Sequence, residues 1–187
     1  MPRDTLAPFH PLPRCPMSPD VSPAPAPLTP VSSRARVEAA LRALGMPSDI
    51  VEFGTSTRTS AEAAAAIGCE VAQIAKSVVF RGKQSDACIV VIASGADRVD
   101  EKKLAALLGE KVSRADADFV RQRTGFAIGG VAPVGHAGAV TVLVDQALWA
   151  LDPIWAAAGT PNTVFRLSAD DLHRIPDIRV VDVRQAG

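Results

Sequence analysis

The distribution of proline limits where this chain can fold. Ten of its 15 prolines lie in residues 1–30. Proline has no backbone N–H and fixes φ, so this stretch is unable to form a helix or a central strand. We therefore predict a disordered or polyproline-II tail over residues 1–31 and one folded domain over residues 32–187. The tail does not read as a secretory signal, because prolines, Asp4 and Asp20 interrupt every apolar run.

Charge and cysteine content restrict the class of protein further. The chain has 20 Lys+Arg against 20 Asp+Glu, and 48% of its residues are hydrophobic, which fits a globular protein and excludes a polyelectrolyte. Because no global basic field exists, a nucleic-acid partner would have to be held by a local patch. Cys15, Cys69 and Cys88 form no C-x-x-C pair, which favours a reducing, cytoplasmic location without disulfides.

Helices and strands are mixed irregularly after the tail. Capping residues and apolar spacing predict helices after Ser32 or Ser33, over 61–67 behind Ser60, after Asp100 with Leu104, Leu107 and Leu108 facing the core, over 116–123, and over 168–174. Apolar β-branched runs predict strands at 49–53, 76–80, 87–93, 139–144, 163–167 and 178–183, with a hairpin turn at 82–86. Because no regular βαβ repeat emerges, we predict an α+β domain with a mixed sheet.

One uncharged segment resembles a membrane span in length alone. Residues 125–144 contain no Asp, Glu, Lys or Arg, yet five of these residues are glycine and one is proline. A lipid-exposed backbone broken in this way would leave its own hydrogen bonds unsatisfied. We predict a glycine loop followed by a buried strand, and no membrane association.

Common catalytic signatures are missing from the sequence. It contains no G-x-S-x-G, no H-E-x-x-H, no Cys/His zinc spacing and no P-loop, so we predict neither a metal nor a cofactor. Two features remain unusual. The loop Gly129–His136 pairs glycines with a proline, which would aim backbone N–H groups at a ligand or simply make a tight connection. Lys76 opens an apolar strand, where it would either reach the surface or point into a pocket.

Three segments match, in order, the motifs of a known family. They are the stretch 56–80, with Ser56-Thr57-Arg58-Thr59, an alanine helix ending at Gly68 and Gln73 to Phe80; Ser94-Gly95 with Asp100 to Leu104; and Thr124 to His136. Together they resemble the YbaK family, also called prolyl-tRNA-synthetase-associated domains, over roughly residues 35–183. The resemblance implies a mixed, partly barrel-like sheet with packed helices. It also implies a free-standing deacylase that hydrolyses mischarged aminoacyl-tRNA in trans, above all tRNA for proline carrying a small wrong amino acid.

The resemblance also assigns roles to individual residues. Lys76 would position the terminal adenosine and its phosphate, while the backbone of Gly129 and Gly130 would stabilise the ester carbonyl oxygen as charge develops. An adjacent ribose hydroxyl of the substrate would assist the attack, so no protein nucleophile is needed. We expect replacement of Gly130 to reduce catalysis more than stability. The implied substrate-binding residues are Ser56, Thr57, Ser77, Pro133, Gly135, His136 and Asp145, the last of which is equally well explained as a helix cap.

The expected partners are the acceptor end of tRNA and prolyl-tRNA synthetase, with no DNA. A local basic patch would come from Arg98, Lys102, Lys103, Lys111 and Arg114, for which a solvated helix face is the alternative. A non-catalytic tRNA- or synthetase-binding module of the same fold, or a small-molecule binder, are the competing functions. Alanine, serine, threonine, cysteine and 2-aminobutyrate all remain candidate acyl groups, since Ser77 leaves the specificity open.

Overall fold

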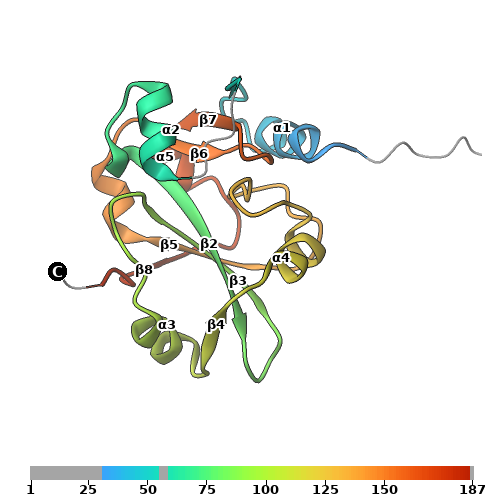
Figure 1. Ribbon diagram of the computed structural model, residues 1–187, viewed down its shortest axis with the longest axis vertical. Coiled ribbons are helices and arrows are strands. Elements are labelled where there is room, and N and C mark those ends of the chain that lie inside the picture. The colour runs from blue at the N-terminus through green and yellow to red at the C-terminus, as the bar shows by residue number, and fades with distance from the viewer. Residues whose placement is uncertain (1–30, 55–58, 186–187) are drawn as a thin grey trace, which may run out of the picture. The chain divides into compact units, whose positions relative to one another are not determined.

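The computed structural model describes residues 31–54 and 59–185, and within them eight strands form one mixed sheet (Figure 1). The strand order is β1-β7-β6-β2-β3-β5-β8, with β4 paired to β2. The predicted α+β class is confirmed. The strands are β1 (Ile50–Glu52), β2 (Ile74–Gly82), β3 (Cys88–Ser94), β4 (Val112–Arg114), β5 (Thr141–Asp145), β6 (Ile154–Ala157), β7 (Thr163–Leu167) and β8 (Arg179–Val181). The helices are α1 (Ser33–Ala43), α2 (Ser60–Ile67), α3 (Glu101–Leu108), α4 (Ala117–Thr124) and α5 (Ala169–Leu172), with short 3₁₀ helices η1 (Val71–Gln73) and η2 (Gln146–Ala150).

The β2–β3 hairpin is the centre of the sheet. The two strands pair antiparallel from Ala75 opposite Ser94 to Arg81 opposite Cys88, as the sequence predicts. β2 then pairs parallel with β6, and β3 pairs parallel with β5. These parallel pairs make the sheet mixed and bring segments distant in sequence alongside the hairpin.

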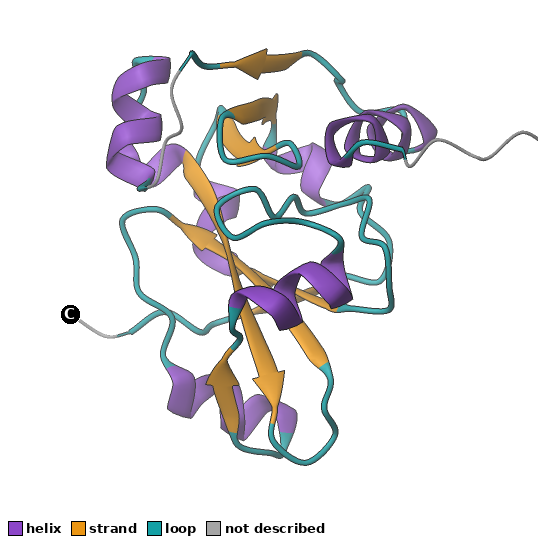
Figure 2. Ribbon diagram, turned by 45° about the vertical axis from the view of Figure 1, so that its right-hand side comes forward, coloured by secondary structure: helices purple, strands orange, loops and turns teal. Residues whose placement is uncertain are grey.

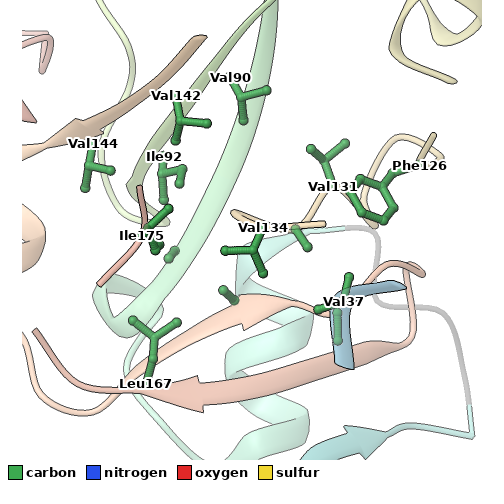
Figure 3. Close-up of a cluster of buried hydrophobic side chains, with 14 of the residues drawn as sticks. Val37, Val90, Ile92, Phe126, Val131, Val134, Val142, Val144, Leu167 and Ile175 are labelled. Carbon is green, nitrogen blue, oxygen red and sulfur yellow. The ribbon is translucent and has the colours of Figure 1, made fainter. Parts of the chain in front are cut away.

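Both faces of β3 are covered, and all seven of its residues are buried. Val90 and Ile92 belong to the larger core cluster, together with side chains from β5 and from the loop before it (Figure 3). Ile89 and Val91 point to the opposite face and join a smaller cluster that includes Leu104 of α3. A strand buried on both faces has no polar side to present, which explains its continuous apolar sequence.

The helices lie close to the predicted positions, with three corrections to a cap, a core-facing residue and a helix end. α2 is capped by Thr59 rather than Ser60, because Thr59 accepts from the Glu62 N–H while the Glu62 carboxylate accepts from the Thr59 N–H. Leu107 was predicted to face the core, but it is 40% exposed, since only Leu104 and the partly buried Leu108 reach the sheet. α5 is a single turn and ends at Leu172 rather than near residue 174.

Two short strands, β4 and β6, were not predicted from the sequence. β6 contains Ala156 and Ala157, which have little intrinsic preference for strands. It forms because β7 pairs with it on one side and β2 on the other. Pairing of this kind overrides local preference, and no window of the sequence reveals it.

The uncharged segment 125–144 is a loop followed by β5, as predicted. Among the described residues, no helix has the length and apolar character needed to span a bilayer. Figure 2 shows this loop folding over the sheet above α4, while α3 and β4 lie near the hairpin turn at the other end. The fold thus leaves the start of β2 next to α2 and the glycine turn.

The predicted tail, residues 1–31, lies outside the described residues apart from Val31. Residues 31–187 form a compact unit by themselves. We expect deletion of residues 1–30 to change the melting temperature by no more than about 2 °C, because a proline-rich segment contributes little to a core. Differential scanning calorimetry of the full and shortened chains measures this, and a clearly larger drop would show that the tail packs on the domain.

Candidate functional site

A small cavity of about 110 Å³ lies between α2, the start of β2, the β6–β7 pair and the turn that contains Gly129. The described residues that line it combine apolar side chains, four hydroxyl-bearing residues and one lysine. Segments from three distant parts of the chain meet here, since the parallel pairing of β2 with β6 sets Trp155 beside Ile74. The lining residues are Thr59, Ser60, Ala63, Ile74, Ala75, Lys76, Ser77, Gly129, Val131, Trp155, Ala157, Pro161, Thr163 and Val164.

Among the described residues that line this cavity, Lys76 is the charged one. It is half-buried, and its ammonium donates to the backbone carbonyls of Gly95, at 3.2 Å, and Asp97. Burial lowers the pKa of Lys76; the nearby Arg114 and Arg98 lower it further, and Asp97 opposes them. Lys76 thus lines the cavity, and its ammonium is bonded to the loop that follows β3. Its two hydrogen bonds hold the loop after β3 against the cavity wall.

Gly129 lies at the cavity because of a tight turn. The Gly130 N–H donates to the Ala127 carbonyl at 2.9 Å, and Gly129 has φ +85°. A positive φ at the third position of such a turn is the mark of a type II turn and favours glycine. The absence of a side chain on Gly129 leaves the turn's backbone exposed to the cavity.

Gly130 differs from the expectation. Its N–H donates to the Ala127 carbonyl, and Gly130 does not line the cavity. A Cβ at this position would lie 2.7 Å from backbone atoms of Thr160. Gly130 is thus required for the close approach of two loops, and the structure gives it a packing role.

Pro133, Gly135 and His136 lie elsewhere. They border a separate, largely apolar hollow of about 450 Å³ between α1 and the loop before β5. Gly135 packs on the backbone of Arg36, whose guanidinium also lies over the ring of Phe126. The structure does not bring these three loop residues to the Lys76 cavity, because the chain turns away after Val131.

His136 is a half-buried residue whose Nε2 atom is buried. It has a hydrogen bond with the Ala132 backbone, while its Nε2 has no partner among the described residues. Its ring meets Phe126 edge-on at 5.8 Å between centroids. Burial is the main cause that lowers the pKa of His136 to about 4.

This pKa predicts acid sensitivity. The unfolded chain binds a proton on His136 below its ordinary pKa of 6.5, but the folded chain does so only below about 4, so His136 subtracts stability as the pH falls through this window. We expect His136→Gln to lose less stability than wild type between about pH 7 and pH 4.5, by roughly 2 kcal/mol. Urea unfolding at both pH values measures it, and parallel losses in both proteins would contradict it.

Asp145 has a structural role. It is 2% exposed, and it accepts from the Ala147 N–H at 2.9 Å through Oδ1 and from the Val183 N–H at 3.0 Å through Oδ2. It thereby caps η2 and ties the C-terminal segment to β5. The cap alternative raised by the sequence accounts for it, and Asp145 does not line the cavity.

The remaining predicted site residues divide in two. Ser77 lines the cavity next to Lys76, whereas Ser56 and Thr57 lie outside the described residues. Trp155 and Thr163 line the cavity but were not assigned a role from the sequence, because their approach depends on β6 and β7. In residues 31–54 and 59–185, no three His, Cys, Asp or Glu side chains gather as a metal site would require.

A family model described as the aminoacyl-tRNA editing domain matches residues 55–175. The match contains the whole lining of the cavity, from Thr59 to Val164. This chain belongs to the aminoacyl-tRNA editing domain family. The editing-domain resemblance drawn from the sequence is confirmed, while α1 and β8 lie outside the matched residues.

Relatives of this editing domain occur alone and inside a synthetase. The uncharacterized protein YwhH of Bacillus subtilis is 36% identical over 124 residues, which cover 66% of this chain and 78% of YwhH. The proline–tRNA ligase of Limosilactobacillus fermentum is 33% identical over 110 residues, which cover 56% of this chain but 19% of the ligase. A crystal structure of a proposed trans-editing enzyme for prolyl-tRNA synthetase superposes with a TM-score of 0.76 at 39% identity, covering 85% of this chain and 99% of that one.

Proposed function

We propose that this editing domain is an aminoacyl-tRNA deacylase that acts in trans on tRNA for proline carrying a small, wrongly attached amino acid. The observation that carries the proposal is that Lys76 and Gly129 line one small cavity whose walls also present apolar side chains and hydroxyl-bearing residues. The family supports an aminoacyl-tRNA substrate. The relatives described as a proline–tRNA ligase and as a proposed trans-editing enzyme support tRNA for proline and action in trans.

The proposed reaction is hydrolysis of the ester between the amino acid and the terminal ribose. A water oxygen bonds to the carbonyl carbon, the bond from that carbon to the ribose oxygen breaks, and the ribose oxygen takes up a proton. The products are a free amino acid and tRNA with an intact hydroxyl. Among its described lining residues the cavity has no His, Asp, Glu or Cys to serve as general base. The neighbouring ribose hydroxyl of the substrate therefore assists the attack in this proposal.

The protein contributes position and charge. Lys76 is anchored by two backbone carbonyls, so its ammonium holds the terminal adenosine or its phosphate in a fixed place. The turn backbone at Gly129 faces the ester carbonyl, where oriented dipoles stabilise developing negative charge. Ser77 also lines the cavity, and in this proposal it contacts the substrate.

The residues that line the cavity limit the size of the amino acid that fits. Ala63, Ala75 and Ala157 contribute only methyl groups, while Val131 and Trp155 close the space around them. Alanine, serine, cysteine, threonine and 2-aminobutyrate have side chains of suitable size. We propose that large aromatic or long charged side chains are excluded.

The test is a set of deacylation assays with purified tRNA for proline charged with alanine, serine, cysteine, threonine, 2-aminobutyrate, phenylalanine or proline. We expect rapid hydrolysis for one or more of the small non-cognate groups and slow hydrolysis for phenylalanine and proline. EDTA is expected to leave the rates unchanged. Binding without hydrolysis would favour the non-catalytic module, and neither binding nor hydrolysis would favour a ligand unrelated to tRNA.

A further inference from the structure

A second, polar groove adjoins the Lys76 cavity and takes no part in the chemistry described above. It has a volume of about 570 Å³ and lies along the loop that joins β3 to α3. That loop connects the two spaces, because the Lys76 ammonium binds its Gly95 and Asp97 carbonyls while Lys76 lines the cavity and Asp97 lines the groove. The groove is lined by Ala96, Asp97, Arg98, Lys103, Asp182, Arg184 and Gln185.

The groove is built on a braced backbone. Val99 and Arg184 form an antiparallel bridge, flanked by hydrogen bonds from Gln185 N–H to the Arg98 carbonyl at 2.8 Å and from Asp100 N–H to the Val183 carbonyl at 2.7 Å. Lys103 donates from Nζ to the Arg184 carbonyl at 2.9 Å. These contacts fix the segments that carry both arginines, so the groove exists before any ligand arrives.

The positive charge in the groove is only partly compensated. Lys103 pairs with Asp182 at 3.2 Å, whereas the exposed side chains of Arg98 and Arg184 have no ion pair among the described residues. Arg98 also lies near enough to Lys76 to act on its charge. The three cations of the groove, Arg98, Lys103 and Arg184, thus outnumber its two described carboxylates, Asp97 and Asp182. An anion bound there would relieve their mutual repulsion, and arginine matches phosphate with paired donors.

We propose that this groove binds the phosphodiester backbone of the single-stranded 3′ end of the RNA whose terminal ester enters the Lys76 cavity. Arg98 and Arg184 contact the phosphates, and Lys103 positions the Arg184 backbone. This inference rests on the proposed function for its substrate. The groove also contains part of the local basic patch that was predicted for binding nucleic acid. Arg98 and Lys103 belong to the groove, while Arg114 pairs instead with Glu101.

The experiment compares two substrates that share the ester but differ in phosphate. One is alanyl-tRNA for proline, and the other is 2′(3′)-O-alanyl-adenosine, which has no phosphate. The protein variants are R98A/R184A and, as a matched control, R121A, which removes an exposed arginine of α4 that does not line the groove. Kinetics are measured over a series of salt concentrations. In parallel, fluorescence anisotropy measures binding of a short single-stranded RNA that ends in CCA.

We expect R98A/R184A to lose at least about tenfold more kcat/KM on the tRNA than on alanyl-adenosine, because hydrogen bonds between charged groups are lost only with the phosphates. The salt dependence of RNA binding should become shallower by about 1.4 in log–log slope, since each single-strand phosphate contact contributes about 0.7. R121A should resemble wild type in both measurements.

Three outcomes would overturn the groove assignment. They are equal losses of R98A/R184A on both substrates, RNA binding by R98A/R184A that matches R121A, or no RNA binding by wild type at low salt. Failure of the proposed function has a different signature. In that case wild type hydrolyses neither alanyl substrate nor any other small non-cognate ester of tRNA for proline, while R98A/R184A still loses RNA binding relative to R121A, which would support the groove without the hydrolysis.

Discussion

Replacing Lys76 with methionine is expected to lower deacylation by about 100-fold or more, because the terminal nucleotide loses the charge that fixes its position. The structure adds a smaller expected cost in stability. The ammonium donates to the carbonyls of Gly95 and Asp97, and losing both hydrogen bonds should cost about 1–2 kcal/mol. For a domain of this size that is a fall in melting temperature of about 2–6 °C.

Lys83→Met is the matched control for Lys76→Met. Lys83 is an exposed lysine at the hairpin turn of the same two strands, and it is far along β2 from the cavity. We expect its variant to keep wild-type turnover and stability. Single-turnover assays measure the deacylation rate of both variants, and thermal unfolding measures their melting temperatures. Near-normal turnover of Lys76→Met would remove Lys76 from the proposed site.

Replacing Gly130 with valine is expected to destabilise the fold itself. A Cβ there would lie 2.7 Å from the Cα and carbonyl carbon of Thr160, and backbone atoms have little freedom to move aside. Overpacking of this kind costs about 1–3 kcal/mol or more, which is a fall of about 2–12 °C in melting temperature. This reverses the expectation from the sequence that Gly130 serves catalysis more than stability.

Gly54→Val is the control for this prediction. A Cβ at Gly54 meets no atom within 4 Å among the described residues, and its φ is outside the left-handed region. We expect Gly54→Val to melt close to wild type. If Gly130→Val also melts normally but loses deacylation, the catalytic interpretation of Gly130 would return and the packing interpretation would fall.

The sequence was sufficient for features that depend on neighbouring residues. Asp100 is the N-cap of α3, and Gly68 ends α2 in the left-handed conformation. Both roles depend only on contacts with residues within one helical turn along the chain. The apolar runs of β2 and β3 and the turn between them predict the hairpin for the same reason. Lys76 was singled out because a lysine at the start of a buried strand is unusual wherever the strand goes.

The tertiary structure alone decided which of these residues meet. Lys76, Gly129 and Trp155 come together because β2 pairs with β6 and the glycine turn packs on the loop before β7, contacts between segments distant along the chain. The same packing took Gly130 and His136 out of the cavity. Backbone donors were predicted at Gly130 because glycine permits them, but whether an N–H is free depends on its partner, here Ala127. Sequence records what a residue is able to do, whereas only long-range packing determines which atoms are near enough for it to act on.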